Sequence, residues 1–376
     1  MTLTAGELCA GAGMLGMSAR AVLGDAETAW VCETDSDASR VLAERFGVPN
    51  HGDITALDWS TVEPVDVMVG GWPCQPFSLA GKRKGMNDER AIWPAFADAI
   101  RVVRPRVFLG ENVPGILARG QLGRVVADLA RIGYVGSWLC LRASDVGAPH
   151  QRKRLFVVAA DPDREPVRLQ PVPVGAREPA TVVGGDSPRA LMPTPDATDH
   201  GVGNQGRDGS PNLATAVALL PTPNATDSGG GGRTVPEHRT HDGPDFGPRL
   251  RDVALLLPTP IASPWTRNAT VNRDPDDDGH SGTTLADVAY ADRWAQYGPA
   301  IARWEAVLGR PAPDPTVTGK RGGRRLSGRF CEWLMGWPDG WVTDLVDNTA
   351  ALRIAGNGVV PQCATAAYRM LMEMSA

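Results

Sequence analysis

One cysteine of this chain lies in a setting that suits nucleophilic chemistry. Cys74 stands between two prolines, directly after the apolar run at residues 65–69 and two glycines. The run predicts a buried strand, and the prolines stiffen the turn that follows it. Open α/β sheets bind substrates at the carboxyl ends of their strands. Although most intracellular cysteines are small buried hydrophobes, this position predicts a thiolate nucleophile.

A basic loop follows the cysteine. Lys82, Arg83 and Lys84 are flanked by glycines, and no apolar residue anchors the loop before Met86. Such a loop suits closure over a substrate, and its charge suits a phosphate backbone. The alternative is a solvated surface loop.

A second motif predicts a cofactor site. Gly11, Gly13 and Gly16 match Gly-x-Gly-x-x-Gly between an apolar run and a helix-like segment, where glycines permit a tight turn and close approach to a ligand. Glu33, after the next apolar run, suits ribose hydroxyls, and Asp53 suits an adenine amino group. Alone, this pattern fits NAD as well as S-adenosylmethionine.

Polar residues adjoin two more predicted strands. Glu111 begins Glu-Asn-Val after the strand at 107–109, and Arg152 and Arg154 precede the strand at 155–159. A buried carboxyl at a strand end is a candidate general acid.

Composition limits the class of protein. The chain has 376 residues and a formal net charge of −5, which does not indicate a nucleic-acid-binding protein. A basic cluster therefore supports nucleic-acid binding only where it adjoins another motif. Six scattered cysteines, without metal-ligand spacing, predict reduced thiols and no structural zinc. No signal peptide or transmembrane run is evident, so we expect a cytoplasmic protein.

The elements that must position these residues alternate along residues 1–160. Strand-like and helix-like segments follow one another, which predicts a parallel sheet covered by helices on both faces. We expect Asp35 to cap a helix that runs to Phe46, with Gly47 at its end. Further helices are predicted at about 89–103 and 122–132, and strands at 138–141 and 155–159.

Residues 161–325 differ in composition, since they hold most of the chain's 32 prolines. A Pro-Thr-Pro segment recurs at 192–199, 220–227 and 257–264, with variable loops between the copies. The stretch is either a modular ligand-binding surface or a loosely ordered linker. Beyond it, Pro299 and Ser327 are expected to start helices, and a final helix should run to Met374.

Taken in order, these motifs resemble the DNA cytosine-5 methyltransferase family. The resemblance covers residues 1–160 closely and resumes at about 324–376. It implies a Rossmann-like, S-adenosylmethionine-dependent methyltransferase sheet with an inserted, irregular, Pro/Gly-rich target-recognition domain. The implied domains are a catalytic and cofactor-binding lobe at 1–160, a target-recognition lobe at 161–349 that ends in the 324–341 helix motif, and a returning segment at 350–376.

The resemblance also implies a mechanism. The Cys74 thiolate adds to carbon 6 of a cytosine extruded from the duplex, so that carbon 5 attacks the methyl group. Glu111 protonates or hydrogen-bonds ring N3. Of Arg152 and Arg154, one lies near O2 and the thiol and the other structures the site. The base that removes the carbon 5 proton is not identified.

The remaining site residues fall into two sets. The residues that the resemblance assigns to S-adenosylmethionine are Leu8, Cys9, Ala10, Gly11, Gly13, Glu33, Thr34, Asp53, Ile54, Pro73, Asn357 and Val359. Those assigned to DNA are Gln75, Ser78, Lys82, Arg83, Lys84, Arg324 and Arg325. His150 stands where the family often has Gln, and we expect this exchange to alter DNA or loop contacts rather than chemistry.

Several alternatives stay open. A tRNA cytosine-5 methyltransferase would share the catalytic half but carry a shorter insert. An NAD-dependent oxidoreductase would explain only the glycine motif, and a non-catalytic DNA-binding module would not need Cys74 or Glu111. Amino-methyltransferases are disfavoured because their Pro-Pro-aromatic signature is absent.

We expect a monomer that acts on double-stranded DNA, with no metal. A cognate restriction endonuclease is a further candidate partner. No motif selects the DNA sequence that is methylated or the insert residues that contact its bases.

Overall fold

The computed structural model describes residues 2–24, 26–72, 92–170, 294, 297–319 and 324–375. Cys74, the basic loop and the Pro-Thr-Pro segments lie outside these residues.

The centre of the molecule is a six-stranded sheet with the order β2-β1-β3-β4-β6-β5. Strands β2, β1, β3 and β4 are parallel, whereas β6 is antiparallel to both of its neighbours. The strands are β1 (Leu3–Leu8), β2 (Ala26–Cys32), β3 (Val67–Gly71), β4 (Val107–Asn112), β5 (Val135–Leu141) and β6 (Arg154–Ala160).

The expectation of a parallel sheet is therefore correct for four strands and wrong for β6. Residues 142–153, which join β5 to β6, hold only the 3-10 helix Ala143–Val146. A parallel connection needs a crossover, usually a helix, that carries the chain back to the other end of the sheet. Without one, β6 pairs beside β5 in the opposite direction.

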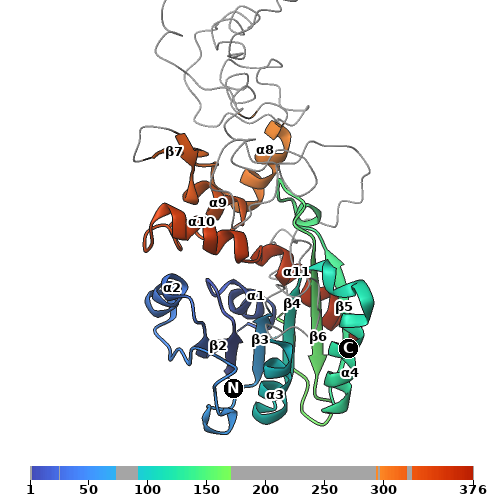
Figure 1. Ribbon diagram of the computed structural model, residues 1–376. Coiled ribbons are helices and arrows are strands. Elements are labelled where there is room, and N and C mark those ends of the chain that lie inside the picture. Colours follow the sequence, from blue (N-terminus) through green and yellow to red (C-terminus); the bar gives the residue numbers. More distant parts are fainter. Residues whose placement is uncertain are drawn as a thin grey trace, which may run out of the picture.

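Helices cover both faces of the sheet (Figure 1). On one face, α1 (Met14–Leu23) and α11 (Pro361–Ser375) pack against side chains such as Val69 and Phe156. On the other, α3 (Trp93–Val103) and α4 (Gln121–Arg131) pack against side chains such as Met68 and Phe108. Because successive strand residues alternate between the faces, each strand contributes to both cores. The last helix, α11, thus packs against the same sheet to which the first strand belongs.

The helix α2 (Ser36–Phe46) has the ends that its sequence predicts. The Asp35 carboxylate accepts hydrogen bonds from the backbone N–H groups of Asp37 and Ala38, and Gly47 ends the helix in the left-handed conformation. Both the cap and the stop are confirmed, and together they fix where the chain leaves β2.

The segment after the insert lies beyond the carboxyl ends of the parallel strands (Figure 1). It comprises α8 (Gly298–Leu308), the hairpin of β7 (Thr316–Thr318) and β8 (Arg324–Leu326), α9 (Gly328–Leu334) and α10 (Asn348–Asn357). Pro299 lies in the first turn of α8, and the Ser327 hydroxyl caps α9, as predicted. Side chains of α8, α9 and α10 share one apolar core with α1 and α11. No helix in the described part of the chain is long and apolar enough to span a membrane.

Candidate active site and cofactor site

The turn between β1 and α1 has a backbone shape that requires glycine. Gly11 and Gly13 have φ angles of 55° and 78°, in the left-handed region. A Cβ atom on Gly13 would lie 2.4 Å from the Phe46 ring, whereas one on Gly11 would meet no described atom within 4 Å. The turn is therefore closed toward α2 at Gly13 and open at Gly11, where a ligand can approach the backbone.

Glu33, at the end of β2, holds this turn through backbone hydrogen bonds. Its Oε2 accepts from the N–H of Gly11 at 2.7 Å, and its Oε1 accepts from the N–H groups of Thr34 and Asp35 at 2.8 Å each. Carboxylates that accept backbone N–H bonds form strong, charge-assisted contacts. The carboxylate thus fixes the turn and lies beside its open position.

The Asp53 segment is tied to the same strand end. The Asn50 side chain accepts from the N–H of Glu33 and from that of Gly52. Asp53 is exposed, and hydrogen bonds from Thr55 lower the pKa of its carboxyl. The predicted partners Leu8, Ala10 and Ile54 are buried around this region, and Cys9 is half-buried. An open backbone turn with two adjacent carboxylates fits an adenosine-containing cofactor, whose ribose and amino groups are hydrogen-bond donors.

A second polar cluster lies at the carboxyl end of β4. Glu111 is mostly buried, and its Oε1 lies 3.0 Å from Nε of Arg154 at the start of β6. Burial raises the pKa of the Glu111 carboxyl, and the guanidinium groups of Arg154 and Arg152 partly offset that rise. β4 and β6 are neighbours in the sheet, so the sequence-predicted acid and arginine meet across one strand pair.

Arg152 contacts the C-terminal segment. It is buried, and its guanidinium donates to the carbonyl oxygens of Gly356 at 2.8 Å and Gly358 at 2.5 Å. Its own φ angle of 27° is unusual for a residue with a side chain. Of the two arginines, Arg154 pairs with Glu111, and Arg152 holds the segment around Asn357 by hydrogen bonds.

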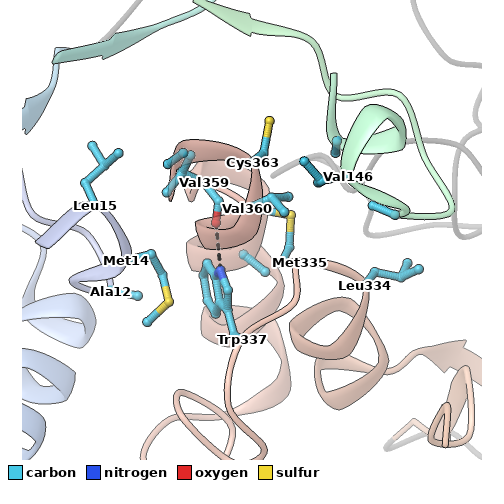
Figure 2. Packing of buried hydrophobic residues seen from close by; sticks show 14 of the residues in the cluster. Ala12, Met14, Leu15, Val146, Leu334, Met335, Trp337, Val359, Val360 and Cys363 are labelled. Carbon is cyan, nitrogen blue, oxygen red and sulfur yellow. Dashed lines mark hydrogen bonds between the residues drawn. The ribbon is translucent and has the colours of Figure 1, made fainter. Parts of the chain in front are cut away.

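Asn357 and Val359 lie in the segment that Arg152 contacts. Asn357 is the exposed last residue of α10, and the buried Val359 accepts a hydrogen bond at 2.8 Å from the indole N–H of Trp337. Figure 2 shows Trp337 between Met14, at the start of α1, and the segment that holds Val359. Val359 is therefore connected through Trp337 to the packing at the start of α1, the helix that the glycine turn opens.

His150 has a different environment from the one expected. It is fully buried, and its Nε2 is hydrogen-bonded to the carbonyl oxygen of Leu334 at 3.0 Å. Burial lowers the pKa of its imidazole to about 3. The residue thus joins the Arg152 segment to α9 inside the protein, and the expectation that the exchange with Gln alters DNA or loop contacts stays a prediction.

The structure describes only part of the predicted set. Arg325 lies on β8 and is half-buried, with its backbone paired to Val317. The predicted residues outside the described atoms are Pro73, Cys74, Gln75, Ser78, Lys82, Arg83, Lys84 and the side chain of Arg324.

Sequence reasoning missed two features of the site. Trp337 is buried, and its indole N–H orders the Val359 backbone. Glu7, on β1, is buried with its carboxyl against Gly16 of α1, and burial raises its pKa to about 8. A carboxyl inside an apolar strand is the one signal that could have indicated Glu7.

The fold is that of an α/β protein with polar residues gathered at one edge of its sheet, and comparisons with known proteins are more specific. Residues 3–184 match the model of the C-5 cytosine-specific DNA methylase family. The Type II methyltransferase M.BsuFI of Bacillus subtilis is 36% identical over 137 residues, which is 35% of this chain and 33% of the relative. The Type II methyltransferase M.AplI of Arthrospira platensis is 44% identical over 126 residues, 33% of this chain and 36% of the relative. The alignments thus span about a third of each relative's length.

Among solved structures, the Entamoeba histolytica methyltransferase EhMeth has the same fold, with a TM-score of 0.51 at 13% identity over 100% of this chain and 99% of that one. The match over residues 3–184 is thus with the C-5 cytosine-specific DNA methylase family and covers just under half of the chain. The family resemblance drawn from the motifs is confirmed.

Proposed function

We propose that this protein transfers the methyl group of S-adenosylmethionine to carbon 5 of a cytosine in duplex DNA. The observation that carries the proposal is the buried Glu111 carboxyl at the end of β4, paired with Arg154 inside the family-matched region. Because its pKa is raised, the Glu111 carboxyl is protonated to a greater extent at a given pH than an ordinary carboxyl, which suits donation to a ring nitrogen.

The chemistry assigns a role to each residue. The Cys74 thiolate adds to carbon 6 of the base, and electrons move toward ring N3 and O2 as the C5–C6 double bond opens. Glu111 donates its proton, or a hydrogen bond, to N3, and the Arg154 guanidinium stabilises charge at O2. After methyl transfer, a base removes the carbon 5 proton, Cys74 leaves with its bonding electron pair, and a proton donated to N3 returns to Glu111. Arg152 holds the C-terminal segment instead of contacting the base.

The glycine turn is proposed as the cofactor site. S-adenosylmethionine supplies an electrophilic methyl group when bound. The open backbone at Gly11, the Glu33 carboxylate and the exposed Asp53 carboxylate would hold its adenosine part. Thr34, Asn357 and Val359 complete the proposed pocket, with Pro73 from the cysteine turn.

The DNA contacts and domains remain proposals as well. We propose the domain division into 1–160, 161–349 and 350–376, in which the long insert reads the duplex, and the length of the insert favours DNA over tRNA. The cysteine cannot reach a stacked cytosine, so the base must be extruded. The names of the relatives favour a Type II modification enzyme, which would pair with a restriction endonuclease.

A methyl-transfer assay tests the proposal. Labelled S-adenosylmethionine is offered with mixed-sequence duplex DNA or with tRNA, to the wild type and to a Cys74→Ser variant. We expect label at carbon 5 of cytosines in DNA only, lost in the variant while S-adenosylmethionine still binds. Label in tRNA alone would establish the rival substrate, and label in neither would refute the proposal.

A further inference from the structure

The indole of Trp341 reaches the glycine turn from the far end of the chain. Its Nε1 donates a hydrogen bond of 2.8 Å to the carbonyl oxygen of Ala12, which lies between the two glycines with positive φ. The two residues are separated by 329 positions. This contact therefore joins the turn to the segment that follows the insert.

Two residues at the end of α2 hold the indole in place. The Phe46 ring meets it edge to face, with ring centroids 5.9 Å apart and an interplanar angle of 71°. The Arg45 guanidinium lies 5.1 Å from the indole centroid and donates to the carbonyl oxygens of Trp341 at 3.0 Å and Gly340 at 2.6 Å. Cation–π and edge-to-face contacts of this kind favour one ring orientation. The indole N–H is thus aimed at Ala12 by side chains outside the turn.

The same Phe46 ring closes the other side of Gly13, where a Cβ atom would lie 2.4 Å from it. On the opposite side of the turn, Glu33 accepts from the N–H of Gly11. The turn is therefore fixed at Gly11 by Glu33 and at Ala12 by Trp341. Within the turn, the N–H of Gly13 donates to the carbonyl oxygen of Ala10 at 2.8 Å. Because glycine gains the most entropy when it is released, the Gly11–Gly13 backbone would be less ordered without the added contacts from Glu33 and Trp341.

We propose that Trp341 is a positioning residue for the cofactor-binding turn. Its N–H holds the Ala12 peptide so that the Gly11 face is presented to S-adenosylmethionine without a cost in ordering the turn on binding. The inference rests on the proposed function in one respect, the identity of the cofactor. It adds a residue outside the glycine motif and makes cofactor affinity depend on the segment after the insert.

The test compares Trp341→Phe with a matched control. Phenylalanine keeps a ring between Arg45 and Phe46 but removes the N–H. Trp304→Phe is the control, since its indole also donates to a backbone carbonyl, that of Trp333 at 3.0 Å, away from the turn. The dissociation constant for S-adenosylmethionine is measured by calorimetry, and the turnover number is measured at saturating cofactor. Amide hydrogen exchange of residues 10–16 is measured without cofactor.

We expect Trp341→Phe to bind S-adenosylmethionine about three- to tenfold more weakly, as the loss of one hydrogen bond implies. The turnover number should stay within about twofold, and amides of the turn should exchange faster. Trp304→Phe should change neither cofactor affinity nor exchange in the turn. Wild-type affinity and exchange in folded Trp341→Phe would overturn the inference.

A variant that does not fold and a wild type that does not bind S-adenosylmethionine have different consequences. If Trp341→Phe does not fold, Arg45→Gln is used instead, because it removes the guanidinium that aims the indole, and the same weakened binding and faster exchange are expected. If the wild type binds no S-adenosylmethionine, the proposed cofactor is wrong. Hydrogen exchange alone then decides the role of Trp341 in the turn.

Discussion

The glycine turn and the Glu111 cluster lie at the same edge of the sheet but are built in opposite ways. The turn is shaped by backbone conformation and by the Glu33 carboxylate, which accepts a hydrogen bond from the N–H of Gly11. The cluster consists of buried charged side chains, in which Arg154 pairs with an acid whose pKa is raised. The first arrangement is suited to binding, and the second is suited to moving a proton.

The difference implies different kinetic signatures. Damage to the turn should weaken cofactor binding and leave the chemical step almost unchanged. Damage to the cluster should slow the chemical step and leave cofactor binding unchanged. Each variant below either separates these two effects or shows that the separation is wrong.

The largest effect is expected for Glu111→Gln. The amide cannot donate the acid's proton, so the turnover number should fall by about 10²- to 10⁴-fold. The wild-type rate should fall as pH rises through the raised pKa of Glu111, because the protonated form is lost, and the variant should lack this decline. Single-turnover methyl transfer across pH measures both, and exposed Glu27→Gln is the control. A loss of cofactor affinity with unchanged turnover would contradict the assigned role.

Glu7 sharpens the comparison, because it is a buried acid beneath the turn instead of in the cluster. Its pKa is about 8 in the folded protein against 4.5 as the ordinary value, so the folded state binds more protons between these limits. The free energy of unfolding should therefore fall as pH rises through this range and level off above it. Glu7→Gln should remove the fall and be more stable at pH 8, by on the order of a few kcal/mol.

Denaturant unfolding of wild type and Glu7→Gln at pH 5, 6, 7 and 8 measures the difference, with exposed Glu44→Gln as the control. Parallel curves for wild type and Glu7→Gln would show that Glu7 does not titrate in this range.

The smallest effect is expected for Glu33→Gln. The carboxylate accepts three backbone hydrogen bonds, and an amide oxygen cannot replace both of its oxygens. Cofactor affinity should fall about tenfold, while turnover at saturating cofactor stays within about threefold. Calorimetry and steady-state rates measure the two quantities. A large fall in turnover with unchanged affinity would break the comparison.

The same two regions show how much the sequence could predict. The glycines of the turn, the Asp35 cap and the Gly47 stop are each marked by residues within a few positions of one another, so local patterns predicted them, although Glu33 and Trp341 hold the turn from distant positions. Glu111 and Arg154 were identified as single residues next to predicted strands, but their pairing depends on β6 lying beside β4. The reversed direction of β6 was missed because periodicity predicts a strand without its orientation.

Contacts between distant segments could not be predicted at all. Arg152 reaches Gly356 and Gly358, His150 reaches Leu334, and Trp341 reaches Ala12. Each contact joins a side chain to a backbone carbonyl, and every residue has a carbonyl, so no residue type marks the partner. These contacts appear only once the C-terminal segment is packed over the carboxyl ends of the strands.

The central claim is that a sulfur atom bonds transiently to the base, and a trapping experiment tests it most directly. A duplex containing 5-fluorocytosine at the methylated position is incubated with wild-type protein and S-adenosylmethionine. Fluorine cannot leave as a cation after methyl transfer, so the adduct should persist. We predict a denaturation-resistant protein–DNA conjugate, with mass spectrometry placing the bond at Cys74. An active enzyme that forms no conjugate, or one joined through another residue, would contradict the account.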